Sequence, residues 1–119
     1  MSYEENQSFE KRKSPRMNWM NPEVQVIMKS LNNKSKIWGW IQNISQDGFK
    51  VRVETSQKVE GFFERWRELR FETFEDFFQL RGQGRIVWIS SKENMAGIKF
   101  DQLHEESRRF VDAFLGIFP

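Results

Sequence analysis

The chain has 119 residues and a net charge of +2, and its hydrophobic fraction of 38% is accompanied by 12 Phe and 5 Trp. This length is enough for one domain with a single core, and the aromatic content predicts bulky side chains in that core. The slight net charge argues against an extended positive electrostatic field that would attract nucleic acid polymers or membrane surfaces. The absence of cysteine excludes disulfides and thiolate metal sites.

Residues 1–16 are expected to form a flexible N-terminal arm. Its first part is polar and acidic and contains no apolar core of a signal peptide. A basic run follows, with cations at Lys11, Arg12, Lys13 and Arg16. By itself, such a run is typical of a solvated basic tail. No window of the sequence approaches the length of a membrane span, so we expect a cytoplasmic protein without membrane insertion.

The alternation of apolar and polar residues predicts a meander of three strands after a linker at Met17–Pro22. The predicted strands are Val24–Met28, Ile37–Ile44 and Phe49–Val53. On the second strand, Asn43 is expected on the same face as Ile41, with Ile44 on the opposite face. Trp19, in the linker, is expected to pack the arm against the domain.

The aromatic stretch from 59 to 78 fits both a helix and a strand. We interpret Val59–Arg67 as a connection that can include a helical turn, and Glu68–Thr73 as a fourth strand. The density of aromatic side chains exceeds what a connection needs, so some of them are expected to be exposed for a partner. The candidates for this partner surface are Phe62, Phe63 and Trp66.

The last two strands are predicted at Phe77–Ile89 and Met95–Phe100. The first of them is expected to bulge or bend at Gly82-Gln83-Gly84, since glycine weakens the interior of a strand. A Gly-x-Gly sequence indicates a phosphate loop only where it opens a helix, and here a strand follows it. Trp88 in this strand is expected to belong to the core.

Apolar residues then recur at helical spacing and predict an amphipathic helix from Leu103 to Gly116, which covers one open end or face of the sheet. Asp101 is the expected N-cap, and Gly116 with Pro119 ends the helix. The single histidine, His104, lies at the start of this helix and is expected to cap it or to be solvated.

The sequence predicts a binding protein without a cofactor rather than an enzyme. With one histidine, no cysteine and no metal-ligand spacing, no nucleophile with a nearby base can be assembled. The neighbouring acids Glu75 and Asp76 are interpreted as a charged turn and not as a catalytic pair.

Two short motifs follow one another along the chain, Arg12-x-x-x-Arg16 and Asn43-x-Ser45-x-x-Gly48. Alone, the second motif is a turn between strands, in which Asn and Asp side chains hydrogen-bond their own backbone and the glycine supplies a positive φ angle. In this order, with a strand or two between them, the two motifs resemble the signature of the PilZ domain family.

The resemblance extends over nearly the whole chain after the arm. Gly84–Trp88 looks like the family's glycine-led strand, and Ala96–Phe100 looks like its Gly-x-x-Phe strand. Asn43 departs from the family pattern, because many members carry Asp at this position. This difference is expected to affect how a base of the ligand is recognised. A second departure is the stretch 59–78, which is more elaborate than the usual short connection and suggests an interface of this protein's own.

The resemblance implies a mainly β fold, in which residues 17–119 form a small antiparallel six-stranded split β-barrel with a C-terminal amphipathic helix at 103–116. It also implies a bacterial receptor for the second messenger cyclic di-GMP. This ligand carries two phosphodiester charges and two guanines, and arginine both forks onto phosphate oxygens and stacks on purine faces.

By the same resemblance, Arg12 and Arg16 bind the phosphates and guanine faces, with the arm closing over the ligand. Asn43 and Ser45 hydrogen-bond a guanine edge, and Gly48 keeps a Cβ atom out of the ligand's space. Candidates for additional ligand contacts are Lys11 and Lys13.

The family further implies that ligand occupancy is relayed to a protein effector, so as to control motility, surface polysaccharide or attachment in biofilms. A PilZ-like adaptor that has lost the ligand and acts by protein contact is the alternative. A barrel for single-stranded nucleic acid is disfavoured, because Lys50 and Arg52 are too few cations for one strand face. A monomer and a ligand-dependent homodimer are both compatible with the sequence.

Overall fold

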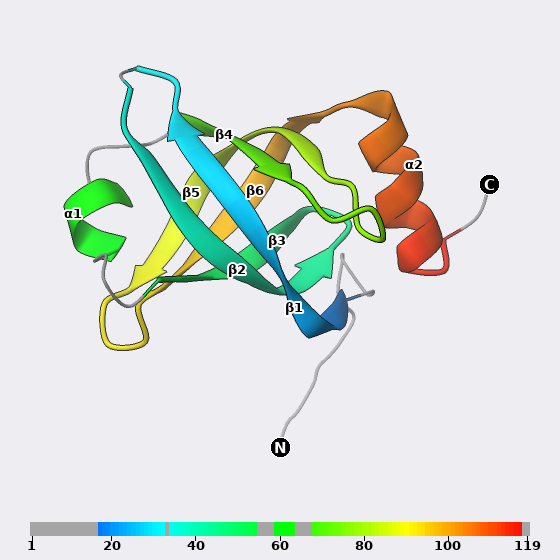
Figure 1. Cartoon of the computed structure of the whole chain (residues 1–119), viewed down its shortest axis with the longest axis horizontal. Helices are drawn as coiled ribbons and strands as arrows, with labels where there is room; N and C mark the ends of the chain where they lie inside the picture. Colours follow the sequence, from blue (N-terminus) through cyan, green and yellow to red (C-terminus); the bar gives the residue numbers. More distant parts are fainter. Residues whose placement is uncertain (1–16, 33, 55–58, 64–67, 118–119) are drawn as a thin grey trace.

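The computed structural model describes residues 17–32, 34–54, 59–63 and 68–117. Its strands are β1 (Met17–Ser30), β2 (Lys36–Ser45), β3 (Gly48–Val53), β4 (Glu68–Thr73), β5 (Arg81–Ser90) and β6 (Met95–Leu103). Its helices are α1 (Val59–Phe63) and α2 (Glu105–Phe114). In Figure 1 the strands wrap around one axis, with α1 and α2 at opposite ends.

The strands form a closed antiparallel barrel in the order β1-β2-β3-β6-β5-β4. The meander of β1, β2 and β3 is the one predicted from the sequence, and β6 then joins β3 to β5. β1 closes the barrel because its later part, Val26–Lys29, pairs with β2 on one side and with β4 on the other. The predicted six-stranded antiparallel barrel with a C-terminal helix is therefore confirmed.

Aromatic rings fill the centre of the barrel. The ring centroids of Phe49 and Phe71 are 5.1 Å apart in an edge-to-face arrangement, and Phe100 lies 5.6 Å from Phe71 and 6.0 Å from Phe49. Such pairs contribute about 0.5–1.5 kcal/mol each beyond the burial of their area. The bulky core expected from the composition is thus supplied by rings from β3, β4 and β6.

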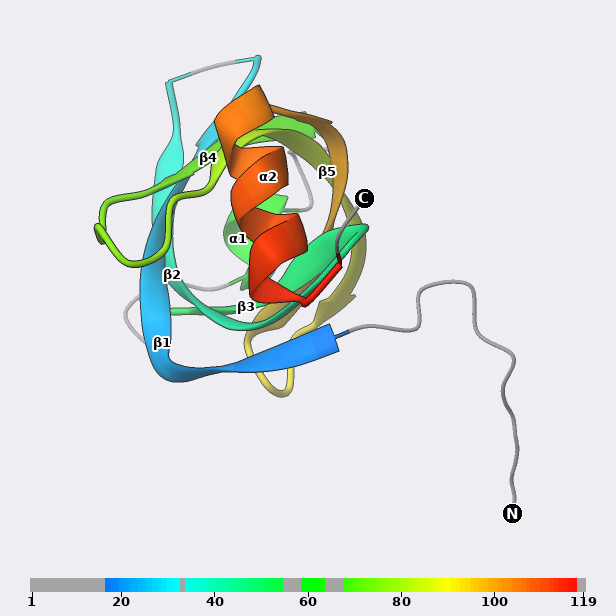
Figure 2. The same ribbon diagram turned by 90° about the vertical axis from the view of Figure 1, so that its right-hand side faces the viewer.

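Helix α2 covers one end of the barrel, as Figure 2 shows. Two apolar side chains are buried beneath it: Val111 of the helix and Leu115, the residue that caps its C-terminus. The ring of Phe78, which is itself buried, packs edge-on against Phe110 and Phe114 at 5.3 and 5.4 Å. The amphipathic pattern of the C-terminal segment therefore seals the core, as predicted from its spacing.

Helix α1 contributes to the core as well, which corrects one expectation. Phe63 is 2% exposed and belongs to the core, and Phe62 is partly buried against it. The partner surface expected on this stretch is therefore wrong for the Phe63 ring, while Trp66 lies outside the described residues. Large exposed rings are found instead at Phe74 and Phe77, in the connection between β4 and β5.

The predicted linker at Met17–Pro22 is wrong, because these residues are the first part of β1. The ladder between β1 and β2 shifts its register between Trp19 and Val24, and Pro22 within this interval has no backbone N–H to donate. Trp19 is 62% exposed, so its indole is not packed as expected.

The C-terminal helix runs from Glu105 to Phe114, inside the predicted range 103–116. His104 occupies the N-cap position but makes no side-chain capping hydrogen bond. Asp101 is not the N-cap: it lies in β6 and pairs with Arg85 at 2.8 Å, and this hydrogen-bonded carboxylate raises the pKa of Arg85. Neither helix in the described part of the chain is long and apolar enough to cross a membrane.

Truncating the central ring, Phe71→Ala, is expected to lower the free energy of unfolding by about 3–5 kcal/mol, because it leaves a cavity between the other rings. Phe74→Ala is the matched control, since Phe74 lies a few residues further along and is 61% exposed. Its cost is expected to stay within about 1 kcal/mol. Urea denaturation of both variants compares them, and equal losses would contradict the assigned core.

Candidate functional site

A β-bulge in β2 decides which way Asn43 faces. Ile41 lies opposite Val51, whereas Asn43 lies opposite Lys50, so Gln42 is an extra residue in β2. Beyond the bulge Asn43 shares the outer face with Lys50, and Ile44 turns into the core. The expectation that Asn43 follows Ile41 on one face is wrong, since strict alternation does not survive an extra residue.

A second bulge, in β5, has the same effect on Trp88. Ile86 lies opposite Ile98 and Trp88 lies opposite Gly97, so Val87 is the extra residue. Trp88 is 43% exposed, and its predicted place in the core is wrong. A third register shift, between Gln83 and Gly84, lies in the expected Gly-x-Gly segment.

These bulges produce a row of residues on the outer face of the barrel across five strands, although the Asn43 side chain within it is covered and only 9% exposed. Trp19 lies opposite Asn43, Asn43 opposite Lys50, Lys50 opposite Gly97, and Gly97 opposite Trp88. We call these five residues the indole row. The ammonium of Lys50 lies 5.4 Å from the centre of the Trp19 ring, within the range of a cation–π contact.

Gly97 allows the indole of Trp88 to lie across β6. A Cβ atom built on Gly97 would come within 2.1 Å of Nε1 of Trp88, so any larger residue must displace the ring. The glycine of the family-like Gly-x-x-Phe strand thus shapes the surface of the row. Its role depends on the register between β5 and β6, which the local sequence does not reveal.

A hollow of about 460 Å³ opens along the indole row. Its lining residues are Met17, Asn43, Ser45, Asp47, Gly48, Phe49, Lys50, Val87, Trp88, Gly97, Ile98 and Lys99. It thus brings the three predicted site residues of the β2–β3 turn together with two cations and a flat indole face. Such a surface offers hydrogen bonds, positive charge and stacking to a ligand.

The turn that carries the second motif is closed by its own serine. Oγ of Ser45 accepts a hydrogen bond from the amide of Asp47 at 3.3 Å and donates to the carbonyl of Gly48 at 3.4 Å. Gly48 does not have the positive φ angle expected for it. It is a glycine because a Cβ atom there would lie 2.0 Å from the carbonyl oxygen of Ile98 in β6.

Contacts from the far end of the chain hold this turn in place. Arg108 of α2 donates from Nη1 to the carbonyl of Gln46 at 3.1 Å, and the amide of Phe100 donates to the carbonyl of Asp47 at 2.7 Å. The guanidinium of Arg108 also lies 5.7 Å from the centre of the Phe100 ring and 3.5 Å from Asp112. Sequence reasoning did not find this residue, because its partners lie far away along the chain.

The arm residues predicted to bind the ligand, Lys11, Arg12, Lys13 and Arg16, lie outside the described residues. The described chain begins at Met17, which lies opposite Ser45 and lines the hollow. Among the described residues, no group of three or more His, Asp or Glu side chains is arranged to hold a metal ion.

The family model of the PilZ domain matches residues 10–116. No curated protein sequence matches the chain. Among solved structures, the chain is similar to the Bacillus subtilis inhibitor of motility MotI/DgrA, with a TM-score of 0.63 and 12% identity over 90% of this chain and 50% of that one.

Some of the similar structures contain a ligand, and two of them serve as examples. The PilZ domain of Escherichia coli YcgR with c-di-GMP has a TM-score of 0.58 and 12% identity, over 88% of each chain. The Borreliella burgdorferi PlzA protein in complex with c-di-GMP has a TM-score of 0.54 and 21% identity, over 77% of this chain and 32% of that one. The chain thus spans half of MotI/DgrA and about a third of PlzA, and these likenesses establish the fold.

Removing the guanidinium that binds the turn, Arg108→Ala, is expected to speed amide exchange in residues 46–48 by about 3- to 10-fold, since one partly exposed hydrogen bond worth roughly 0.5–1.5 kcal/mol is lost. Arg109→Ala is the matched control, because Arg109 is exposed and, among the described residues, forms its ion pair with Glu105 of its own helix. Hydrogen–deuterium exchange measures both, and equal protection of the turn in the two variants would contradict the role of Arg108.

Proposed function

Because the chain belongs to the PilZ domain family, we propose that it is a receptor for cyclic di-GMP, which binds in the hollow along the indole row. The observation that carries this proposal is the convergence of Asn43, Ser45, Lys50 and Trp88 on one outer face of the barrel. The YcgR PilZ domain and PlzA, which have similar folds, are described with c-di-GMP, and this supports the choice of ligand.

The chemistry of the hollow fits a cyclic dinucleotide. Lys50 and Lys99 supply positive charge for the phosphodiesters. Asn43 and Ser45 offer amide and hydroxyl groups to a guanine edge, and the exposed face of Trp88 offers a stacking surface to a purine. The ligand therefore meets cations, hydrogen-bonding groups and an aromatic face on adjacent strands.

The arm completes the proposed site. Arg16 directly precedes Met17 in the sequence, and Met17 lies opposite Ser45 and lines the hollow, which supports a role for the arm at this site. We assign Arg12 and Arg16 to phosphates and guanine faces, with Lys11 and Lys13 as additional contacts. Guanidinium forks suit both tasks, whereas an ammonium suits only the first.

We further propose that ligand occupancy is relayed to a protein effector, with motility, surface polysaccharide or attachment as the outputs. The contact of Arg108 with the motif turn supports a route from the hollow to α2. The alternative is an adaptor that binds no ligand. This alternative relies on an exposed aromatic surface that includes Phe63, and Phe63 is buried. The receptor is therefore the favoured function.

Arg12→Ala and Arg16→Ala are each expected to weaken cyclic di-GMP binding by about 10- to 150-fold, which corresponds to the loss of a charged hydrogen bond worth roughly 1.5–3 kcal/mol. Isothermal titration with cyclic di-GMP measures this, with GMP as the ligand control and Arg109→Ala as the protein control. The circular dichroism spectra are expected to stay unchanged. Unaltered affinity in both arm variants would refute the assigned role of the arm, and no binding to the native chain would favour the adaptor.

Trp88→Ala is expected to weaken cyclic di-GMP binding by about 5- to 150-fold, because base–aromatic stacking contributes roughly 1–3 kcal/mol per base. Trp40→Ala is the control for losing an indole elsewhere, since Trp40 donates to Glu54 at 2.6 Å and does not line the hollow. Titration calorimetry of the two variants separates stacking from a general loss of aromatic surface. Equal affinities would place the ligand away from the indole row.

A further inference from the structure

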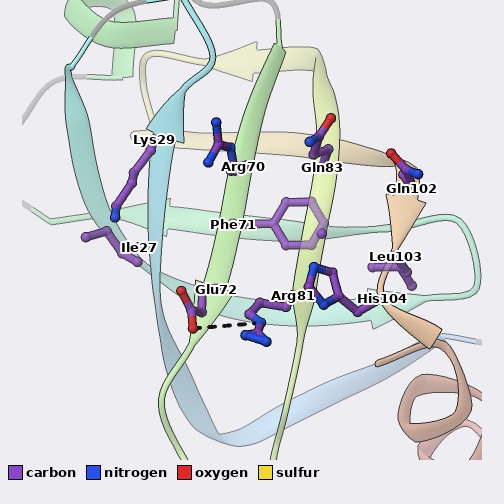
Figure 3. A pocket seen from close by; sticks show the side chains of 11 residues that line it. Ile27, Lys29, Arg70, Phe71, Glu72, Arg81, Gln83, Gln102, Leu103 and His104 are labelled. Carbon is purple, nitrogen blue, oxygen red and sulfur yellow. Dashed lines mark ion pairs between the residues drawn. The ribbon is translucent and has the colours of Figure 1, made fainter. Parts of the chain in front are cut away.

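A second hollow, of about 500 Å³, lies over the outer faces of β4 and β5 and reaches β1 and β6. Figure 3 shows the cations Lys29, Arg70 and Arg81 and the amides Gln83 and Gln102 around it. We call it the Arg70 hollow. None of its lining residues belongs to the hollow along the indole row, so the proposed cyclic di-GMP site leaves it unassigned.

Two positive charges face each other in the Arg70 hollow. Lys29 of β1 and Arg70 of β4 are directly opposed in the antiparallel ladder, and both are exposed. Neither forms an ion pair with another described residue, whereas nearby Arg81 lies 3.9 Å from Glu72. Directly opposed like charges destabilise a sheet. The fold therefore keeps an unfavourable pair that an anionic ligand would relieve.

Amide side chains extend this pair into a row. Arg70 lies opposite Gln83, and Gln83 lies opposite Gln102, so the row Lys29, Arg70, Gln83 and Gln102 crosses four adjacent strands. With strands about 4.8 Å apart, the row is roughly 14 Å long, which matches about four residues of extended chain. Each amide carries a donor and an acceptor, the two groups that a peptide backbone also presents.

We propose that the Arg70 hollow binds an acidic peptide segment of a partner protein. Carboxylates of the segment lie over Lys29 and Arg70, and its backbone lies over Gln83 and Gln102. The charge of the opposed cations selects the acidic side chains, and the spread of donors along a row selects an extended chain. This inference is independent of cyclic di-GMP binding.

The spread of the donors along the row favours a peptide over a single phosphate group. The N-terminus of a helix attracts phosphate through its free N–H groups. Here the first turn of α2 contains Glu105 and Glu106, whose carboxylates repel any anionic group from the end of the hollow marked by His104, so that an anion is expected at Lys29 and Arg70 instead. Recognition of a phosphate requires hydrogen-bond donors that converge on one point. The donors of the Arg70 hollow are instead spread along the row of cations and amides.

The test is an NMR titration of the ¹⁵N-labelled chain with a blocked peptide of sequence Glu-Glu-Ala-Glu-Glu-Ala. We expect amide shifts at the Arg70 hollow and none along the indole row. The matching peptide with Gln in place of Glu is expected to bind at least fivefold more weakly, since only the charge differs. Arg70→Glu is expected to weaken binding of the acidic peptide at least fivefold, and Arg109→Glu, an exposed charge reversal on α2, is expected to leave it unchanged.

The opposed charges allow a second test without a peptide. Arg70→Gln removes the repulsion, so its melting temperature is expected to rise by about 1–4 °C. Lys92→Gln is the control, because Lys92 is exposed in the turn between β5 and β6. A lower melting temperature for Arg70→Gln would contradict the repulsion between Lys29 and Arg70 on which the proposal rests.

Four results of the titrations would overturn the proposal. Equal binding of the Glu and Gln peptides would remove the role of charge. Shifts confined to the indole row, or an unchanged affinity in Arg70→Glu, would locate the peptide elsewhere. Inorganic phosphate that shifts Lys29 and Arg70 where the acidic peptide does not would assign the hollow to a phosphorylated ligand.

Discussion

Closure of the sheet is the constraint on which the other features of this protein depend. β1 pairs with β2 on one side and with β4 on the other, so the inner and outer faces of the strands are defined all around the barrel. A residue can change faces only if its strand contains an extra residue. The bulges at Gln42 and Val87 provide this change, and they turn Asn43 and Trp88 outward on either side of β3 and β6.

The filled interior explains why the candidate sites lie on the outside. The rings of Phe49, Phe71 and Phe100 occupy the centre, while α1 and α2 supply buried side chains at the two ends. The hollow along the indole row and the Arg70 hollow use different residues of the strands that they share. One barrel can therefore carry both proposed sites, the one for a nucleotide and the one for a peptide, on separate surfaces.

Helix α2 connects these surfaces to the C-terminal segment. Arg108 contacts the carbonyl of Gln46 in the motif turn, and Asn18 of β1 donates to the carbonyl of Phe114 at 3.1 Å. The same helix buries Val111 in the core, so it is held by the barrel while it touches two edges of the candidate site. A displacement of the turn would strain these contacts of α2, and the relay proposed above would depend on this coupling.

The sequence by itself determined the number and order of the strands, the amphipathic C-terminal helix and the family, because alternation, helical spacing and ordered motifs are properties of neighbouring residues. It did not determine where β1 and β5 begin. It also indicated Asn43, Ser45 and Gly48 as one turn. Only the tertiary structure decided that Trp88 is exposed, that Phe63 is buried and that Gly48 makes room for β6. These features depend on cross-strand register and on bulges, and the partners that set them lie tens of residues away along the chain.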